Sequence, residues 1–154
     1  MSQTPGGPAG PGAQPVGIVP GMARLDDAAV RALLEAPNYA VISTLNADGS
    51  IESAVVWASL EGDELAVNSA VGRGWPNNLE RDPRVTLLVF PADNPYEYVE
   101  IRGTAAGTLD GADDHIDRLA KKYINQDKYP YRQDGEQRIK YVITPQRVRY
   151  QKQG

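Results

Sequence analysis

The chain has 154 residues, which fits one domain, and it carries a net charge of −4 at pH 7, one histidine and no cysteine. This mildly acidic balance argues against a nucleic-acid-binding surface, because contact with a phosphate backbone calls for a stripe of basic residues. Disulfides are excluded, a zinc site would lack its usual ligands, and no apolar run approaches the roughly 20 residues that span a bilayer.

Residues 1–21 form a low-complexity segment in which 11 of 21 residues are proline or glycine and none is charged. Such a segment buries too little apolar surface to offset the entropy of ordering it. It also lacks the basic and apolar regions of a signal peptide. We therefore predict a disordered tail at 1–21, a folded domain at 22–154 and a cytoplasmic location.

A helix is predicted first, between an N-cap at Asp26 and a stop at Pro37, because apolar residues recur on one helical face between them. Tight turns then follow at Asp48–Gly49 and around Gly62, and Asp-Gly is a strong hairpin signal. Three antiparallel strands are expected around these turns, at residues 39–45, 50–60 and 64–69. They form a meander.

The segment after the third strand carries a candidate anion site. Residues 70–74 form a small loop with one cation, Arg73, and residues 75–81 are expected to form a short helix with proline near its start. Asp82–Pro83 ends this helix, because the residue before proline is pushed out of the α region. A glycine loop that leads to a helix N-terminus beside an arginine suits a bound phosphate. The alternative is a surface connection with a chance arginine.

The remaining elements are two strands, a helix and a final strand or strand pair, at residues 84–90, 96–109, 111–125 and 138–150. Gly103 and Gly107 are the expected bulge points of the long strand, and Pro145 is expected to break the last one. His115 lies in a polar turn of the helix and is expected to be solvated. About six short strands with tight turns and few helices favour a small antiparallel barrel, a mainly β fold.

Two stretches carry a resemblance to a known family: STLNADGSIESAVVWASLEGDELAVNSA at 43–70 and GRGWPNNLERDPRVTLLV at 72–89. They resemble the pyridoxamine 5'-phosphate oxidase-like flavin split barrels, and more narrowly the deazaflavin-dependent oxidoreductases of that superfamily. The resemblance covers residues 25–150 and rests on an ordered set of short motifs. It implies a six-stranded antiparallel split β-barrel of the FMN-binding type, which forms a homodimer with cofactor in a groove at the interface.

The resemblance also implies, position by position, which residues hold the cofactor. They lie on the second and third strands, the loop and the short helix: Ser53, Val55, Trp57, Asn68, Ser69, Ala70, Arg73, Trp75 and Asn78. Trp75 stands where many members have a phosphate-contacting lysine, which leaves more of the anion binding to Arg73 and to backbone N–H groups. Core packing is the alternative role for Trp57, and anchoring the short helix is the alternative for Trp75.

Further candidates lie outside this set. Tyr129 and Tyr131 are expected on the substrate side of the cofactor ring, with an interface loop as the alternative. Arg81 and Arg84 are candidates for meeting an acidic cofactor tail, although a solvated turn is the simpler interpretation.

No protein nucleophile or acid–base pair stands out, which fits redox chemistry that a cofactor carries. The resemblance implies an oxidoreductase that transfers hydride from reduced coenzyme F420, a deazaflavin, to an electron-poor small molecule of enone, quinone or tetrapyrrole type. An FMN-dependent oxidoreductase is the first alternative, and a non-catalytic protein that carries or stores the cofactor is the second. We expect no catalytic side chain, no metal and no nucleic-acid or membrane partner.

Overall fold

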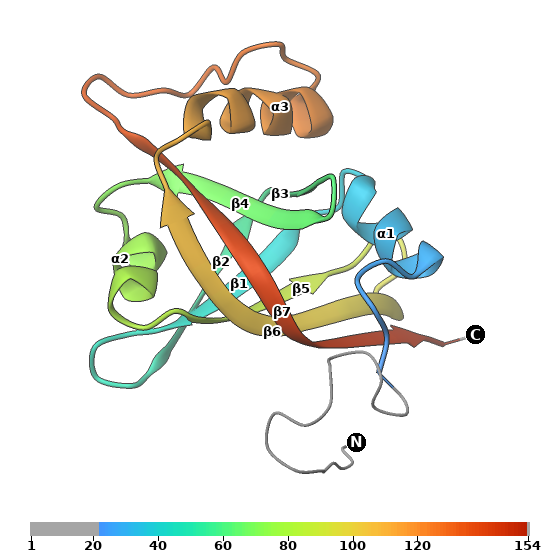
Figure 1. Cartoon of the computed structure of the whole chain (residues 1–154). Helices are drawn as coiled ribbons and strands as arrows, with labels where there is room; N and C mark the ends of the chain where they lie inside the picture. Colours follow the sequence, from blue (N-terminus) through green and yellow to red (C-terminus); the bar gives the residue numbers. More distant parts are fainter. Residues whose placement is uncertain (1–21, 154) are drawn as a thin grey trace.

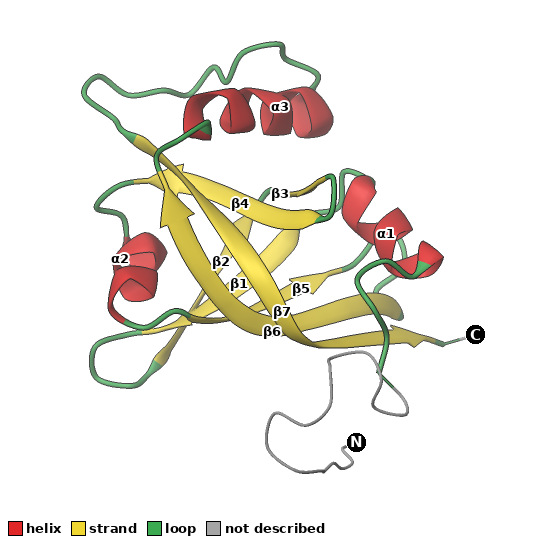
Figure 2. Cartoon of the chain, in the orientation of Figure 1, coloured by secondary structure: helices red, strands yellow, loops and turns green. Residues whose placement is uncertain are grey.

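Alternating apolar and polar residues build seven strands that pair into one antiparallel sheet in the computed structural model of the protein (Figure 1). The structure describes residues 22–153, so the predicted tail at 1–21 lies outside the described residues. The strands are β1 (Ala40–Leu45), β2 (Ile51–Val56), β3 (Ala58–Glu61), β4 (Glu64–Ala70), β5 (Arg84–Val89), β6 (Glu97–Thr108) and β7 (Arg138–Lys152). Three helices lie around the curled sheet (Figure 2): α1 (Ala28–Glu35), α2 (Gly74–Arg81) and α3 (Ala112–Ile124).

The order of the strands explains how the sheet curls on itself. Neighbouring strands run β2-β1-β5-β6-β7-β4-β3, so β2 and β3 lie at opposite ends of the sheet, although only Trp57 separates them in the chain. The predicted split-barrel architecture is confirmed, with seven strands in place of six.

The additional strand arises because the predicted single strand at 50–60 is wrong. Val56 pairs with Ala40 of β1, whereas Ala58 pairs with Val67 of β4. Since the two halves of the segment pair with different strands, the chain must change direction at Trp57. The three predicted strands therefore do not form a simple meander.

The two predicted bulge points of β6 have different outcomes. Arg102 pairs with Arg147 and Gly103 pairs with Pro145, so the register shifts by one residue and the bulge predicted at Gly103 is confirmed. A Cβ on Gly103 would overlap the carbonyl of Thr144. The break predicted at Pro145 is wrong, because β7 runs through it and the bulge absorbs the irregularity.

Gly107 is the second predicted bulge point, and this prediction is wrong because its register with Tyr141 is unbroken. The glycine serves close packing instead, since a Cβ there would lie 2.8 Å from the Tyr141 ring.

The core fills the inside of the curl. Burial alternates along β1 and β5, as expected for strands with one face turned inward. The largest fully buried aliphatic side chains include Ile42, Leu65, Leu87, Ile101 and Ile143. Each contributes roughly 1.5–3 kcal/mol of burial free energy. Helix α1 packs on β3 and β6, α2 on β1 and β2, and α3 on β4 and β7. Because α2 follows the end of β4 after three residues, the start of α2 lies near that end of the strand, where the candidate residues gather.

Candidate functional site

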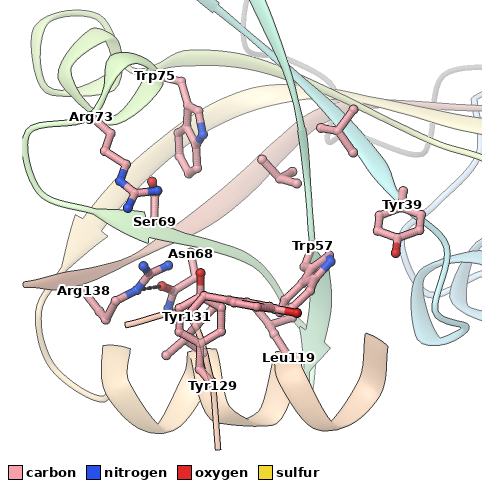
Figure 3. A pocket seen from close by; sticks show the side chains of 13 residues that line it. Tyr39, Trp57, Asn68, Ser69, Arg73, Trp75, Leu119, Tyr129, Tyr131 and Arg138 are labelled. Atoms are coloured by element: carbon pink, nitrogen blue, oxygen red, sulfur yellow. Dashed lines mark hydrogen bonds between the residues drawn. The ribbon is translucent and has the colours of Figure 1, made fainter. Parts of the chain in front are cut away.

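A pocket of about 300 Å³ lies between α2, α3 and the loop that leads into β7 (Figure 3). Aromatic and basic side chains from distant parts of the chain meet there. The lining residues are Tyr39, Val55, Val56, Trp57, Asn68, Ser69, Arg73, Trp75, Ile116, Leu119, Tyr129, Tyr131 and Arg138. Tyr39, Val55 and Tyr131 are each more than half exposed, so the pocket opens to solvent on their side.

The structure brings together most of the residues that the sequence suggested. Those that line the pocket are Val55, Trp57, Asn68, Ser69, Arg73, Trp75, Tyr129 and Tyr131. Ser53, Ala70 and Asn78 are not among the lining residues. The Ser53 hydroxyl lies 2.9 Å from that of Ser43, and Ala70 pairs with Arg138 in the sheet. The binding roles of all these residues stay predictions.

Asn78 is buried beneath α2, where it joins the helix to the β1–β2 hairpin. Its Nδ2 donates to Thr44 Oγ1 at 3.1 Å and to Asn46 Oδ1 at 2.9 Å, while its Oδ1 accepts from Arg81 at 2.8 Å. Asn78 therefore holds α2, and with it Trp75, at the edge of the pocket.

The sequence offered Arg73 as the one cation of the predicted phosphate-binding loop. The structure adds a second cation, Arg138, through a shared contact with Glu136. Arg73 Nη2 lies 3.1 Å from Glu136 Oε1, and Arg138 Nη1 lies 2.8 Å from Glu136 Oε2. The side chains of Glu136 and Arg138 are almost fully buried, whereas that of Arg73 is 54% exposed. Two guanidinium groups and one carboxylate leave this Arg73–Glu136–Arg138 trio with a net charge of +1, which suits an anion.

The backbone adds donors beside this trio. Helix α2 begins just after Arg73, and no side chain of the described residues caps its N-terminus. Pro76 has no N–H and the Asn77 N–H donates to the Arg73 carbonyl at 3.0 Å, so Gly74 and Trp75 carry the backbone donors of the first turn, at the positive end of the helix dipole. The Glu52 carboxylate lies close to Gly74 at the same helix start. The predicted anion site thus has a donor set that fits a phosphate.

The other candidate cations are engaged elsewhere. Arg81 donates to the carbonyl of Leu45 at 2.8 Å as well as to Asn78. Arg84 forms a two-point contact with Asp82, and this hydrogen bonding holds the pKa of the Asp82 carboxyl at about 2. An acidic cofactor tail would therefore share these guanidinium groups with their present partners.

Aromatic rings form the opposite part of the pocket. Trp57 stacks on Tyr123 with centroids 5.3 Å apart, and the edge of Tyr129 meets the Trp57 ring at 6.1 Å. Tyr129 also contacts Tyr131 edge-on at 5.7 Å and lies beneath the Arg138 guanidinium at 4.9 Å. Trp57 is thus held by its neighbours while it lines the pocket.

Trp75 both lines the pocket and anchors α2. Its side chain is 8% exposed, and its ring packs against Tyr141 with centroids 5.6 Å apart. The position of Trp75 therefore allows both roles considered from the sequence, which are contact with a cofactor and anchoring of the short helix.

The loop that carries Tyr129 and Tyr131 is fastened to α3. The Tyr129 N–H donates to Asp117 Oδ1 at 2.8 Å, and Arg132 pairs with Asp113 and Asp117 at 2.9 Å each. The loop therefore keeps its tyrosines at the pocket rim through charges on one exposed helix face.

His115 is buried, so the prediction that it is solvated is wrong. Its ring lies on the same face of α3 as Ile116 and Leu119, which pack toward the sheet. Nδ1 lies 3.0 Å from Asn68 Nδ2, and Nε2 lies 2.9 Å from Ser59 Oγ. Burial lowers the pKa of His115 to about 4, so the ring is neutral at pH 7.

Sequence reasoning missed four lining residues, Tyr39, Val56, Ile116 and Leu119, and two charged groups, Arg138 and its partner Glu136. Glu136 lies at the end of a polar stretch without periodicity and Arg138 begins the last predicted strand, so these two charged residues are far along the chain from Asn68 and Ser69. Only the pairing of β4 with β7, which sets Ala70 opposite Arg138, brings them to the pocket. Among residues 22–153, no helix is long and apolar enough to cross a membrane, and no cluster of three acidic or histidine side chains is arranged to hold a metal ion.

Comparison with known proteins gives one family and several similar folds. A family model described as pyridoxamine 5'-phosphate oxidase matches residues 26–152. Among solved structures, the chain is similar to one described as an F420 reductase, with 27% identity, a TM-score of 0.68 and coverage of 77% of this chain and 94% of that chain. A search of curated proteins found no match.

Two further solved structures share the fold. A conserved hypothetical protein from Mycobacterium tuberculosis, Rv2991, has 17% identity and a TM-score of 0.68, with 86% of this chain and 88% of that chain covered. A putative pyridoxamine 5'-phosphate oxidase from Listeria innocua has 17% identity and a TM-score of 0.57, with 73% and 86% covered. At these identities the likeness shows the fold alone.

Proposed function

The chain belongs to the pyridoxamine 5'-phosphate oxidase family, and we propose that it acts there as a coenzyme F420-dependent oxidoreductase. The observation that carries this choice is its 27% identity with the F420 reductase over most of both chains. The proposed reaction is transfer of hydride to an electron-poor small molecule, such as a conjugated enone, a quinone or a tetrapyrrole.

The chemistry of the pocket supports a flat cofactor with an anionic end. Arg73, Ser69 and the first turn of α2 would hold the phosphate, because they present donors on one side of the cavity. Val55, Trp57 and Tyr129 would hold the ring, because they present apolar and aromatic surface.

The reduced deazaflavin, when bound, supplies the hydride from its central ring. The protein's part is to position the acceptor, exclude water and polarise the group that gains charge. Tyr131 suits the last task, because its side chain lies at the open rim of the pocket and is 60% exposed. No side chain is required to form a covalent bond.

FMN is the second candidate cofactor, and the charge of the site favours it in one respect. The Arg73–Glu136–Arg138 trio can serve one phosphate group, and FMN carries one phosphate group and no further anionic tail. A longer anionic tail would need further cations: Arg84 is paired with Asp82, whereas Arg81 is hydrogen-bonded to the Leu45 carbonyl and has no salt bridge within residues 22–153.

We also propose that the protein is a homodimer whose cofactor groove lies at the interface. Two apolar side chains of β2, Ile51 and Val55, are 71% and 69% exposed. Val55 lines the pocket, and Tyr39 beside it is 51% exposed. A second copy that covers this apolar surface would close the pocket on its open side.

Direct titration distinguishes the cofactors. The purified protein is titrated with F420 and with FMN at the same ionic strength, and binding is followed by fluorescence. We expect tighter binding of F420, and then oxidation of reduced F420 when enones or quinones are added. A tight yellow FMN complex without F420 binding would replace the first proposal with the second.

A further inference from the structure

We propose that His115 is a positioning residue of the pocket: through Nδ1 it fixes the side-chain amide of Asn68, which in turn holds the Arg138 guanidinium at the anion-binding end. The identity of the anion rests on the proposed function, whereas the arrangement of the three side chains does not. His115 itself does not line the pocket.

The hydrogen bonds of Asn68 determine which way its amide points. Nδ2 uses both of its hydrogens, one to the Ala112 carbonyl and one to His115 Nδ1, each at 3.0 Å. Oδ1 accepts from Arg138 Nε at 3.0 Å, as the dashed line in Figure 3 marks. A flipped amide would set its oxygen against the carbonyl of Ala112 and its NH₂ against Arg138 Nε–H. Both contacts are repulsive.

This orientation also determines the state of His115. Nδ1 must accept a hydrogen bond from Asn68, so the ring carries its hydrogen on Nε2 and donates it to Ser59 Oγ. A proton on Nδ1 would point at the Asn68 NH₂ group. His115 can therefore hold the amide only while its ring is neutral.

The surroundings of the ring favour that neutral form. The charged groups that face it are Glu61 on β3, Arg118 on α3, and Lys140 and Arg138 on β7. Burial lowers the pKa most, the three cations lower it further, and Glu61 alone opposes them. Between pH 5.5 and pH 8 the ring is therefore predominantly neutral.

Arg138 is the group that benefits from this arrangement. Its side chain is 4% exposed, and Asn68 holds Nε while Glu136 holds Nη1. Nη2 has no hydrogen-bond partner within residues 22–153, and Arg138 lines the pocket. A nearly buried guanidinium with one unused nitrogen is a site for an anion, provided that Asn68 and Glu136 keep it in place.

The first experiment uses the wild-type protein without any ligand. The chain has one histidine, so the ¹⁵N signals of its imidazole are assigned without ambiguity. We expect the Nε2–H tautomer and no titration between pH 8 and pH 5.5, together with a slowly exchanging Arg138 Nε–H signal, identified by its loss in Arg138→Lys. An Nδ1–H tautomer, or titration near pH 6.5, would overturn the proposal.

The second experiment measures affinity for F420 and FMN in His115→Phe and His115→Gln. If Asn68 no longer holds Arg138, the anion loses a hydrogen bond from a charged group, and such a loss weakens binding roughly tenfold or more. We expect about a tenfold loss in His115→Phe, with faster exchange of Arg138 Nε–H, and partial recovery in His115→Gln, which can again accept from Asn68. Wild-type affinity in a folded His115→Phe, with Arg138 Nε–H unchanged, would contradict the proposal.

Ser59→Ala is the matched control, because Ser59 contacts the ring at Nε2, away from Asn68. Ser59→Ala should lower the melting temperature while its affinity for the cofactor stays within about twofold of wild type. If Ser59→Ala loses as much affinity as His115→Phe, the loss in His115→Phe reflects lower stability, and the positioning role is contradicted. If the wild-type protein binds neither cofactor, the proposed function fails. The imidazole and Arg138 signals still decide the positioning role in that case.

Discussion

Arg73→Ala tests whether the Arg73–Glu136–Arg138 trio binds the cofactor's anion. A hydrogen bond to a charged group contributes about 1.5–3 kcal/mol. The Arg73 side chain is 54% exposed, so solvent screening favours the lower end of that range. A loss near 1.4 kcal/mol corresponds to about tenfold weaker binding. The substitution also lowers the net charge of the trio from +1 to 0.

The same structure predicts the opposite sign at Glu136. Glu136→Gln removes the negative charge, so the net charge rises from +1 to +2, and its single acceptor oxygen can still hold the buried Arg138 while the exposed Arg73 is released toward the anion. Affinity for the anionic cofactor should therefore increase a few-fold. Because Glu136 is buried and Arg73 is exposed, Glu136→Gln should change the melting temperature more than Arg73→Ala does.

Fluorescence titration at low salt measures both effects, and repetition near 1 M salt should shrink them, because the Debye length falls to about 3 Å. Arg24→Ala is the matched control: its side chain is also 54% exposed, and it pairs with Asp26 outside this pocket. Arg73→Lys should recover part of the affinity as a point charge without the fork. Equal affinity in wild type and Arg73→Ala at low salt would refute the anion-site interpretation.

The remaining predictions concern stability and assembly. The folded-state pKa of His115, about 4, lies below its ordinary 6.5, so its contribution to stability is present above pH 6.5 and is lost as the pH falls toward 4. Urea titrations of wild type and His115→Gln at pH 7.5 and pH 4.5 should therefore differ more at the higher pH, and an equal difference would contradict this. Gly103→Ala should lower the urea midpoint strongly, since its Cβ would overlap the Thr144 carbonyl; an unchanged midpoint would show that the bulge can relax. Val55→Lys should make the protein monomeric in analytical ultracentrifugation, because it sets a charge in the exposed apolar surface, and the proposed interface is wrong if a dimer persists. Deleting residues 1–21 should leave the melting temperature and the dimer nearly unchanged, and a large drop would make that segment structural.

Local patterns predicted most of the fold, because each strand and helix follows from its own periodicity and turn residues. The Asp48–Gly49 hairpin and the bulge at Gly103 are of this kind. The break at Trp57 is different, because residues on both sides of it are β-prone and only their partners differ. Nothing within 50–60 itself specifies that change of partner.

The residues of the candidate site also divide into those that the local sequence identifies and those that only strand pairing brings together. Arg73, Ser69 and Asn68 follow one another along the chain, and the sequence could group them. Arg138 joins them only through pairing of β4 with β7, which a single sequence does not display. His115 could have been recognised as buried, because it shares a helix face with Leu119, but its polar neighbours in the sequence hid that spacing.

The single residue between β2 and β3 has a consequence for folding and ligand binding. The β1–β2 and β3–β4 hairpins are local and can form early, whereas β4–β7 and β1–β5 pairing must wait for distant parts of the chain. Trp57 joins β2 and β3, which are the two end strands of the sheet, and its ring lines the pocket. We therefore expect a ligand that contacts this ring to stabilise strand pairing at both ends of the sheet. Amide hydrogen exchange at both edge strands should slow together when cofactor is added, although the two strands are not neighbours in the sheet.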